Sequence, residues 1–418
     1  MRTTQTVRLM LLSGVATAAL MGPAMALDAQ TFVDRVAEVY KVIGYDFQFG
    51  PATLDGDTVT VDGVTVGLTS GGAEMGMEPM VFDAEITFSG VAEGADGSYT
   101  VESVTIPDVD TEFASKPEPV GHVTLSDIRA DGLYLPAGDT IPAVAILQLV
   151  ESISTGALLV TRNGEEVFSI DSMEATSTFN PAQGSADLVD VSSVLAISGI
   201  SVDLSTVAED DAEAGAVIEA LGLTSIQGNI TQDLTWSMAD GHMVVNEFLF
   251  DFADIGALDI TADVTGLTPT VLDDIYAMQA SMVPEGEMTE EQAQAQMMQG
   301  MALMQGVSIV GASVRYDDAS IAGKLLDFYA ASSGTDRATF VAGLKTVLPV
   351  IIGESGIPAL TDIVVPAVST FLDDPQSLEV KVAPPSPTSV LVLMGAAANP
   401  AGLITALGLA IEANTPAE

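Results

Sequence analysis

Hydrophobic residues recur along the chain in one spacing: apolar positions alternate with polar ones, skip two residues and then alternate again. Alternation with a period of two is typical of a β-strand that buries one face. The two skipped residues reverse the facing of the side chains, so the chain must either turn back in a two-residue hairpin or continue through a β-bulge. The copies occupy residues 59–66, 99–106, 123–130, 168–175, 195–202, 243–250 and 307–314.

The residues at the skipped positions separate these two possibilities. Asp62-Gly63 is a dipeptide that favours a type I′ turn, so we expect a hairpin there. Most of the other copies have no such dipeptide and are predicted to be bulged, strongly twisted strands. Asn163-Gly164 predicts a further hairpin. Strands with one polar and one apolar face indicate an antiparallel sheet.

Segments with helical periodicity are expected to pack on the apolar face of this sheet. Caps, prolines and glycines place them at residues 28–43, 143–153, 208–221, 268–282, 289–305, 319–331, 335–348 and 357–372, with a last helix opening at 399–400. Two more strands are predicted at 378–382 and 407–413. The predicted fold class is α+β and β-dominated. It is a large, twisted and curled antiparallel sheet with bulged strands, covered by amphipathic helices, with a helical C-terminal part.

The chain shows no clear linker, so we expect one β-rich domain over residues 27–418. Within it, 27–267 is mainly sheet, 268–306 is a helical, acidic and Met-rich cover, and 307–418 combines a strand with helices. Residues 1–26 have the order of a secretory signal peptide: a basic start, a short apolar run and a small-residue cleavage site.

Cleavage after Ala26 would place the mature chain in the periplasm. An uncleaved anchor is the alternative. No later stretch has the length and hydropathy of a transmembrane helix, so no stable membrane span is expected after cleavage.

The charge balance narrows the possible partners. Twelve Lys and Arg face 58 Asp and Glu, which gives a net charge of −46. Such a surface repels phosphate backbones, so no nucleic-acid partner is expected, and it favours a soluble monomer. The chain contains no cysteine, which excludes disulfides and acylation of a cysteine.

Residues that could carry chemistry are few. His122 and His242 are the two histidines, and neither has partners at zinc-ligand spacing. The aspartates at 55–57 and 108–110 do not continue into a twelve-residue calcium loop, so we interpret them as turn residues, although calcium binding by acidic residues stays open. No nucleophile elbow, P-loop or dinucleotide-binding glycine pattern occurs. We therefore predict no catalytic residue, no metal site and no cofactor.

Methionines gather near the middle of the C-terminal half. Met297, Met301 and Met304 share one face of the helix predicted at 289–305. Thioethers can ligate Cu(I) in an oxidising compartment, and methionine also suits irregular apolar surfaces. A lid, a core contact and a copper site all remain possible for this helix.

Three segments together carry a resemblance to a known group. They are the opening helix with the strand that follows it (28–66), the strand-to-helix step at 314–321, and the closing stretch at 378–387 with its helix at 399–400. They resemble exported, uncharacterised proteins of alphaproteobacterial type that are distantly similar to the AsmA-like periplasmic proteins. The resemblance implies a long curved sheet whose inner face contacts lipid, and it implies no catalytic residues. This chain differs from that group in having no evident membrane anchor.

The predicted function is that of a non-enzymatic periplasmic protein that binds or shields a lipid or another apolar small molecule in a β-groove. One alternative is a structural or interaction protein of the envelope whose core is filled. A more remote alternative is a hydrolase built from scattered carboxylates. The candidate groove residues are Val59, Val61, Phe248, Phe250, Met297, Met301 and Met304.

Overall fold

The computed structural model describes residues 27–416 with short internal gaps. The gaps fall at residues 43, 69–79, 115–119, 139–140, 142–148, 183–187, 206, 208–210, 282–289, 355–356 and 397–399. The predicted signal peptide at 1–26 therefore lies outside the described residues.

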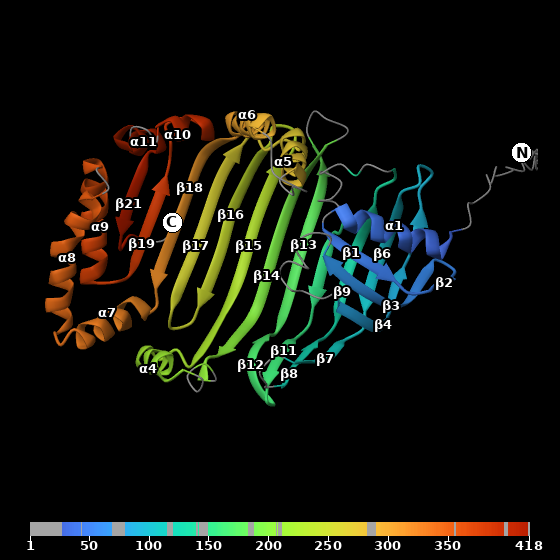
Figure 1. Cartoon of the computed structure of the whole chain (residues 1–418), viewed down its shortest axis with the longest axis horizontal. Helices are drawn as coiled ribbons and strands as arrows, with labels where there is room; N and C mark the ends of the chain where they lie inside the picture. The colour runs from blue at the N-terminus through green and yellow to red at the C-terminus, as the bar shows by residue number, and fades with distance from the viewer. Residues whose placement is uncertain are drawn as a thin grey trace, which may run out of the picture.

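The described strands form one 21-stranded antiparallel sheet that does not close on itself (Figure 1). Both β1 and β2 pair with β3, and the sheet continues through β4, β6, β9, β10 and β13 to β14. From β14 to β19 each strand pairs with the next one in the chain, and β21 follows β19. The β-dominated sheet with a helical C-terminal part confirms the predicted fold class.

The strand bounds are β1 Tyr45–Phe49, β2 Ala52–Asp55, β3 Thr58–Leu68, β4 Met80–Ser89, β5 Ala92–Glu93, β6 Tyr99–Ile106, β7 Val109–Ala114, β8 Val120–Leu125, β9 Ile128–Leu135, β10 Ser152–Thr155, β11 Leu158–Arg162, β12 Glu165–Ile170, β13 Ser172–Pro181, β14 Val189–Asp203, β15 Ser225–Ser237, β16 His242–Phe252, β17 Gly256–Thr265, β18 Ser308–Asp318, β19 Ser377–Val382, β20 Thr388–Ser389 and β21 Leu409–Ala413.

The predicted bulges are confirmed in several strands. The pairing register of β14 shifts between Ile197 and Ile200, and that of β16 shifts between Val245 and Leu249. In the copies at 123–130 and 168–175 the irregularity separates two strands, β8 from β9 and β12 from β13. The skipped residues thus allow the same face of the sheet to stay apolar on both sides of each irregularity.

The hairpin predicted at Asp62-Gly63 is wrong. Strand β3 runs unbroken through these residues, and its pairing with β4 shifts register between Asp62 and Val64. Gly63 has a φ of 84°, which a bulge can use as well as a type I′ turn. The reversal occurs earlier, after Asp55, which pairs with Thr58. The hairpin at 163–164 is confirmed, since β11 and β12 pair across it.

The described helices follow the predicted positions closely. The helix predicted at 143–153 is the exception, because Ile153 lies in β10, while 142–148 are outside the described residues. Pro366 lies within α9 and does not end it, and α10 was not predicted. The bounds are α1 Ala29–Val42, α4 Ala212–Leu221, α5 Pro269–Ser281, α6 Glu290–Gly306, α7 Ile321–Ser332, α8 Arg337–Gly353, α9 Pro358–Asp373, α10 Val390–Ala396 and α11 Pro400–Leu407.

The hydrophobic core lies between α1 and the N-terminal strands. Phe32 is fully buried and meets the rings of Phe88 and Tyr99 edge-on, with centroids 5.2 and 5.4 Å apart. Val33 and Val39 of the same helix are also fully buried. The amphipathic pattern at residues 28–43 predicts a helix that covers the apolar face of the sheet, and α1 covers it.

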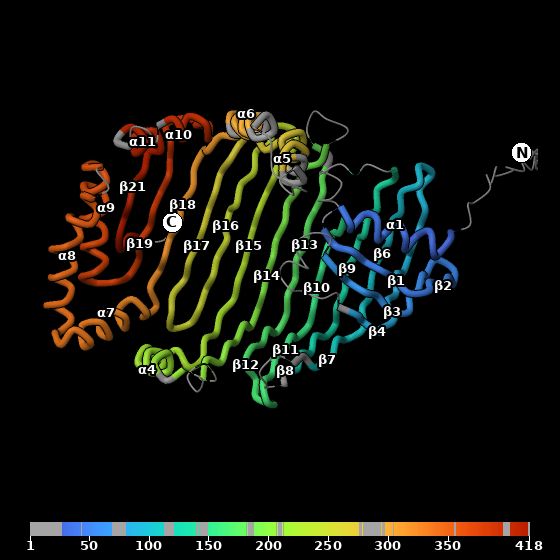
Figure 2. Tube along the Cα trace, viewed as in Figure 1, coloured from blue at the N-terminus to red at the C-terminus, as the bar shows by residue number. Residues whose placement is uncertain are grey.

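The other described helices stand around the sheet. Helices α5, α6, α10 and α11 gather at one end of the strands, α4 and α7 at the other, and α8 and α9 beyond β21 (Figure 1). Helix α9 contacts β19 and β21. Figure 2 shows the strands from β14 to β18 side by side, with none of the described helices crossing their middle.

Candidate ligand-binding face

Residues paired across neighbouring strands share a face of the sheet, so the register defines which side chains lie together. Ile230 of β15 pairs with Ile197 of β14 and with Phe250 of β16. Phe250 in turn pairs with Leu258 of β17. We call this side the apolar face. Its members from β14 to β19 include Leu195, Ile197, Ile230, Leu234, Val245, Phe248, Phe250, Leu258, Ile260, Ala262, Ala312, Val314 and Val380.

The apolar face is continuous with the core under α1. Ala130 of β9 pairs with Val104 of the core on one side and with Ile153 of β10 on the other. Burial changes sharply at this boundary: Leu133 of β9 is 4 % exposed, whereas Ile153 is 40 % exposed. Helix α1 therefore covers one end of a much longer apolar surface.

Beyond that boundary the apolar face stays accessible. Val314 of β18 is 44 % exposed, and Ile260, which pairs with it, is half-buried. Ile200 is buried at the bulge of β14, and Trp236 is buried where its indole N–H donates to the Leu267 carbonyl. The accessible part of the apolar face therefore includes Ile153 of β10, Val314 of β18 and the half-buried Ile260 of β17.

The predicted groove residues fall in three places. Val59 and Val61 of β3 are fully buried in the core with α1. Phe248 and Phe250 of β16 lie together on the accessible part of the apolar face, with ring centroids 4.6 Å apart. The sequence interpretation did not include Ile260 and Val314, although the spacing at 307–314 contains the signal for Val314.

The predicted methionines lie on α6, which borders the apolar face at the strand ends and packs with α5 and α10 (Figure 1). Met297 and Met301 are exposed. The side chain of Met304 lies outside the described residues. The helix is therefore placed beside the strands' ends and does not cross the apolar face.

The opposite face of the sheet is polar and holds a buried ion-pair network. Arg315 donates through Nη2 to Asp317 at 2.6 Å and to the Thr415 carbonyl at 2.8 Å, and its Nη1 lies 3.3 Å from Glu379. Lys381 lies 3.3 Å from Glu379 as well. Because Arg315 and Glu379 are both buried, the network joins β18, β19 and the C-terminal end of the chain.

One carboxyl on the polar face has an unusual environment. Burial raises the pKa of Asp259 above its ordinary 3.8, and the charges of Glu247 and Asp317 act in the same direction. Its Oδ1 is buried without a hydrogen-bond partner. A carboxylate-based hydrolase would need a second carboxyl with a shifted pKa close by and open to a substrate. Asp259 alone does not provide that arrangement.

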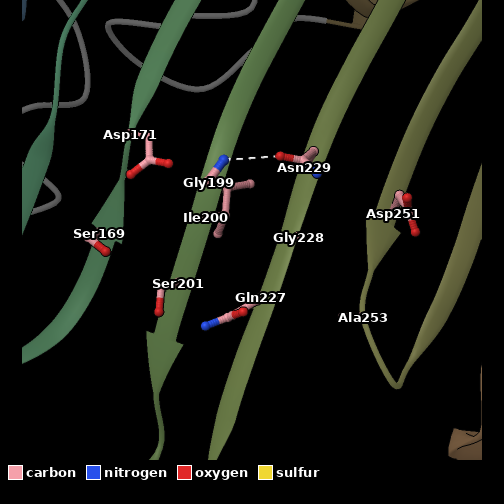
Figure 3. Close-up of a pocket in the computed structure, with 10 residues that line it drawn as sticks. All are labelled: Ser169, Asp171, Gly199, Ile200, Ser201, Gln227, Gly228, Asn229, Asp251 and Ala253. Carbon is pink, nitrogen blue, oxygen red and sulfur yellow. Dashed lines mark hydrogen bonds between the residues drawn. The ribbon is translucent and has the colours of Figure 1, made fainter.

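A polar hollow of about 480 Å³ lies on the polar face beside the bulge of β14 (Figure 3). Asn229 of β15 accepts a hydrogen bond from the Gly199 N–H through Oδ1 at 3.0 Å, while Asp171 lies over Gly199 from the other side. Asp251 completes its rim. Within the described residues, no group of three or more His, Cys, Asp or Glu side chains is arranged to hold a metal ion.

Both histidines pair with aspartates of neighbouring strands. The Nε2 of His122 lies 2.6 Å from Asp110, and that of His242 lies 2.8 Å from Asp263. Each pair is partly exposed and connects two neighbouring strands.

Fold and faces define an open antiparallel sheet with one apolar and one polar side. Among protein families, a model described only as "Uncharacterized protein" matches residues 249–414, from the second half of β16 to the end of β21. That match spans less than half of the chain, and its description names no activity. No curated protein matches the chain. None of the described helices has the length and hydropathy needed to span a bilayer.

Proposed function

We propose that this protein is a non-enzymatic periplasmic protein that binds or shields a lipid or another apolar molecule on the apolar face. The observation that carries the proposal is the break in coverage along one continuous apolar surface. The same surface that is sealed by α1 at Leu133 is open at Ile153 and Val314.

Elementary energetics favour an occupant for such a surface. Each Å² of apolar surface removed from water contributes about 25 cal/mol, and contiguous apolar patches of more than a few hundred Å² mark binding sites on soluble proteins. This face consists mainly of branched and aromatic side chains, and its polar members are few, among them Gln232, which pairs with Leu195 and Phe248, and Ser193, which pairs with Leu234. An acyl chain lying along the strands would bury this apolar surface without needing a polar partner. Such an interaction selects apolar ligands as a class and discriminates little among them.

The charge distribution agrees with a soluble carrier. Within the sheet, the ion pairs of Arg315 lie on the polar face, and the net charge of −46 keeps the loaded protein dispersed. Export through the signal peptide at 1–26 would deliver it to the compartment between two membranes. The resemblance drawn from the sequence alone, to proteins distantly similar to the AsmA-like group, would imply a sheet whose inner face contacts lipid.

Native mass spectrometry and solvent extraction of protein purified from the periplasm test the proposal directly. We expect a co-purifying hydrophobe at a defined ratio. A protein that is free of any hydrophobe, and that a crosslinker joins through the apolar face to another envelope protein, would instead favour the interaction role.

A matched pair of variants assigns the binding to one face. Ile260→Gln with Val314→Gln makes the apolar face polar at one half-buried and one exposed position. Leu249→Gln with Val194→Gln changes equivalent positions on the polar face, where Leu249 pairs with Asp259 and Val194 with Asp233. We expect the first pair to weaken binding of a fluorescent fatty acid by about tenfold or more and the second to leave it unchanged. Equal losses would contradict the proposal.

A further inference from the structure

Three polar side chains interrupt the apolar face and form one polar cluster on it. They are Ser177 of β13, Ser193 of β14 and Gln232 of β15. Ser177 pairs with Ser193, and their hydroxyl oxygens lie 3.2 Å apart. Gln232 pairs with Leu195, the next residue of β14 on the same face, so it is a diagonal neighbour of Ser193.

The Gln232 amide has no hydrogen-bond partner among the residues that the structure describes. It carries two N–H donors and a carbonyl acceptor. Leu195 and Phe248 lie opposite it on the two neighbouring strands, and all three side chains are half-buried. A ligand that covers the apolar face takes water away from this amide. The ligand must then supply a hydrogen-bonding group itself, or lose affinity to an unsatisfied polar group.

Charge is almost absent from the apolar face. Among the paired and described residues of β13 to β19, its one charged member is Asp318, at the last position of β18. The Oδ1 of Asp318 accepts hydrogen bonds from the Tyr316 hydroxyl and the Ala322 N–H. The cations of these strands, Arg315 and Lys381, lie on the polar face. A carboxylate or phosphate on the apolar face would therefore lose water without meeting a positive charge.

We propose that the ligand of the apolar face is an uncharged acyl lipid, bound with its ester group at Gln232 and its chain over Phe248 toward Val314. The ester carbonyl accepts a hydrogen bond from the amide nitrogen of Gln232, and the chain covers the half-buried and exposed apolar side chains. This inference rests on the proposed function and adds the class of headgroup to it. The chain is selected because it is apolar, and the head is selected because it is polar without charge.

A matched pair of probes tests the inference on the full mature protein, after bound hydrophobes have been removed on an apolar resin. The probes are a pyrene-labelled fatty acid and its methyl ester, both titrated at pH 8. Energy transfer to pyrene from Trp236, the one tryptophan of the chain, reports binding. The free acid is ionised at this pH, because an ordinary carboxyl has a pKa of about 4. We expect the ester to bind about tenfold more tightly than the carboxylate, or better.

Variants of one residue locate the headgroup. Gln232→Leu removes the amide and keeps the size of the side chain, so we expect about three- to tenfold weaker binding of the ester. Binding of a pyrenyl alkane, which has no polar group, should not weaken. Gln227→Leu is the matched control on the same strand, because Gln227 lines the polar hollow of the other face (Figure 3). It should bind all three probes like the wild type.

A cation at the same position should reverse the preference. Gln232→Lys places a positive charge on the apolar face, and we expect it to bind the carboxylate more tightly than the ester. Circular dichroism shows whether each variant is folded. The comparison of ester and carboxylate on the wild type does not depend on any variant.

The failure of this inference and that of the proposed function are distinguishable. Equal affinity of the wild type for ester and carboxylate overturns the inference, and so do equal losses in Gln232→Leu and Gln227→Leu. In both cases the proposed function stands, because an apolar probe is bound. A wild type that binds none of the three probes overturns the proposed function and this inference together.

Discussion

The carboxyl group of Asp171 lies directly over Gly199 of the neighbouring strand, in the space that a Cβ on residue 199 would occupy. Gly199 also has a φ of 67° and donates its N–H to Asn229. The bulge of β14 thus depends on a residue without a side chain, for reasons of backbone conformation and of space.

Substitution of this glycine should be costly. We expect Gly199→Ala to lower the free energy of unfolding by about 2–4 kcal/mol, because the positive φ and the contact with Asp171 both oppose a Cβ. Gly164 is the control, since it also has a positive φ but has open space around its Cβ position. Gly164→Ala should cost about 1 kcal/mol. Urea unfolding of both variants measures the difference, and equal losses would show that the contact with Asp171 contributes nothing.

The packing of α1 on the core can be tested by removing one of its buried side chains. Phe32→Ala removes a fully buried ring that contacts Phe88 and Tyr99, and we expect it to cost about 3–5 kcal/mol. Val42→Ala, on the exposed side of the same helix, should change stability by less than about 0.5 kcal/mol. If chemical denaturation gives similar values for the two, the helix does not seal the core.

The Asp259 carboxyl makes stability depend on pH in a defined direction. Burial raises the pKa of Asp259 in the folded protein. The contribution of this side chain to the free energy of unfolding is therefore fully present below the ordinary value of 3.8 and is lost as the pH rises through the folded pKa. Asp259→Asn cannot ionise, so its stability relative to the wild type should increase from pH 4 to pH 7. Thermal unfolding across this range measures the trend.

The buried pair Arg315 and Glu379 should behave non-additively. Arg315→Met leaves Glu379 buried with Lys381 as its remaining cation, and we expect a loss of about 2–4 kcal/mol. Arg315→Met combined with Glu379→Met removes the unpaired charge and should lose less than the single variant does. A double-mutant cycle by urea unfolding gives the coupling energy. A double variant that loses the sum of the two single losses would show that the pair is not coupled.

The sequence predicted strand positions well because alternation and its interruption are local properties. It could not tell a bulge from a turn at Gly63, because both use a positive φ. Which residue opposes which also escaped prediction. Asn229 and Gly199 are 30 residues apart, and only the register of β14 with β15 brings them together.

Helices also show that a local sequence pattern does not identify the element that a segment packs against. The apolar side of a helix is readable from its periodicity, but the strand that it covers is not. Helix α1 buries its apolar side in the core, whereas α8, which has apolar residues on most of its sides, leaves Val347 and Ile351 exposed. Candidate residues chosen from the pattern therefore included Val59 in the core and omitted Val314 on the open face.

The serial order of the strands from β14 to β19 bears on how the molecule unfolds. In the middle of this run, the described β15, β16 and β17 each pair with the strand before and the strand after them in the chain, as the units of a repeat protein do, so stability there is close to a sum of nearest-neighbour contributions. A chain built in this way can lose strands from one end while the rest stays folded. Amide hydrogen exchange should then be slowest under α1 and graded along the array, and denaturation should depart from a single all-or-none step.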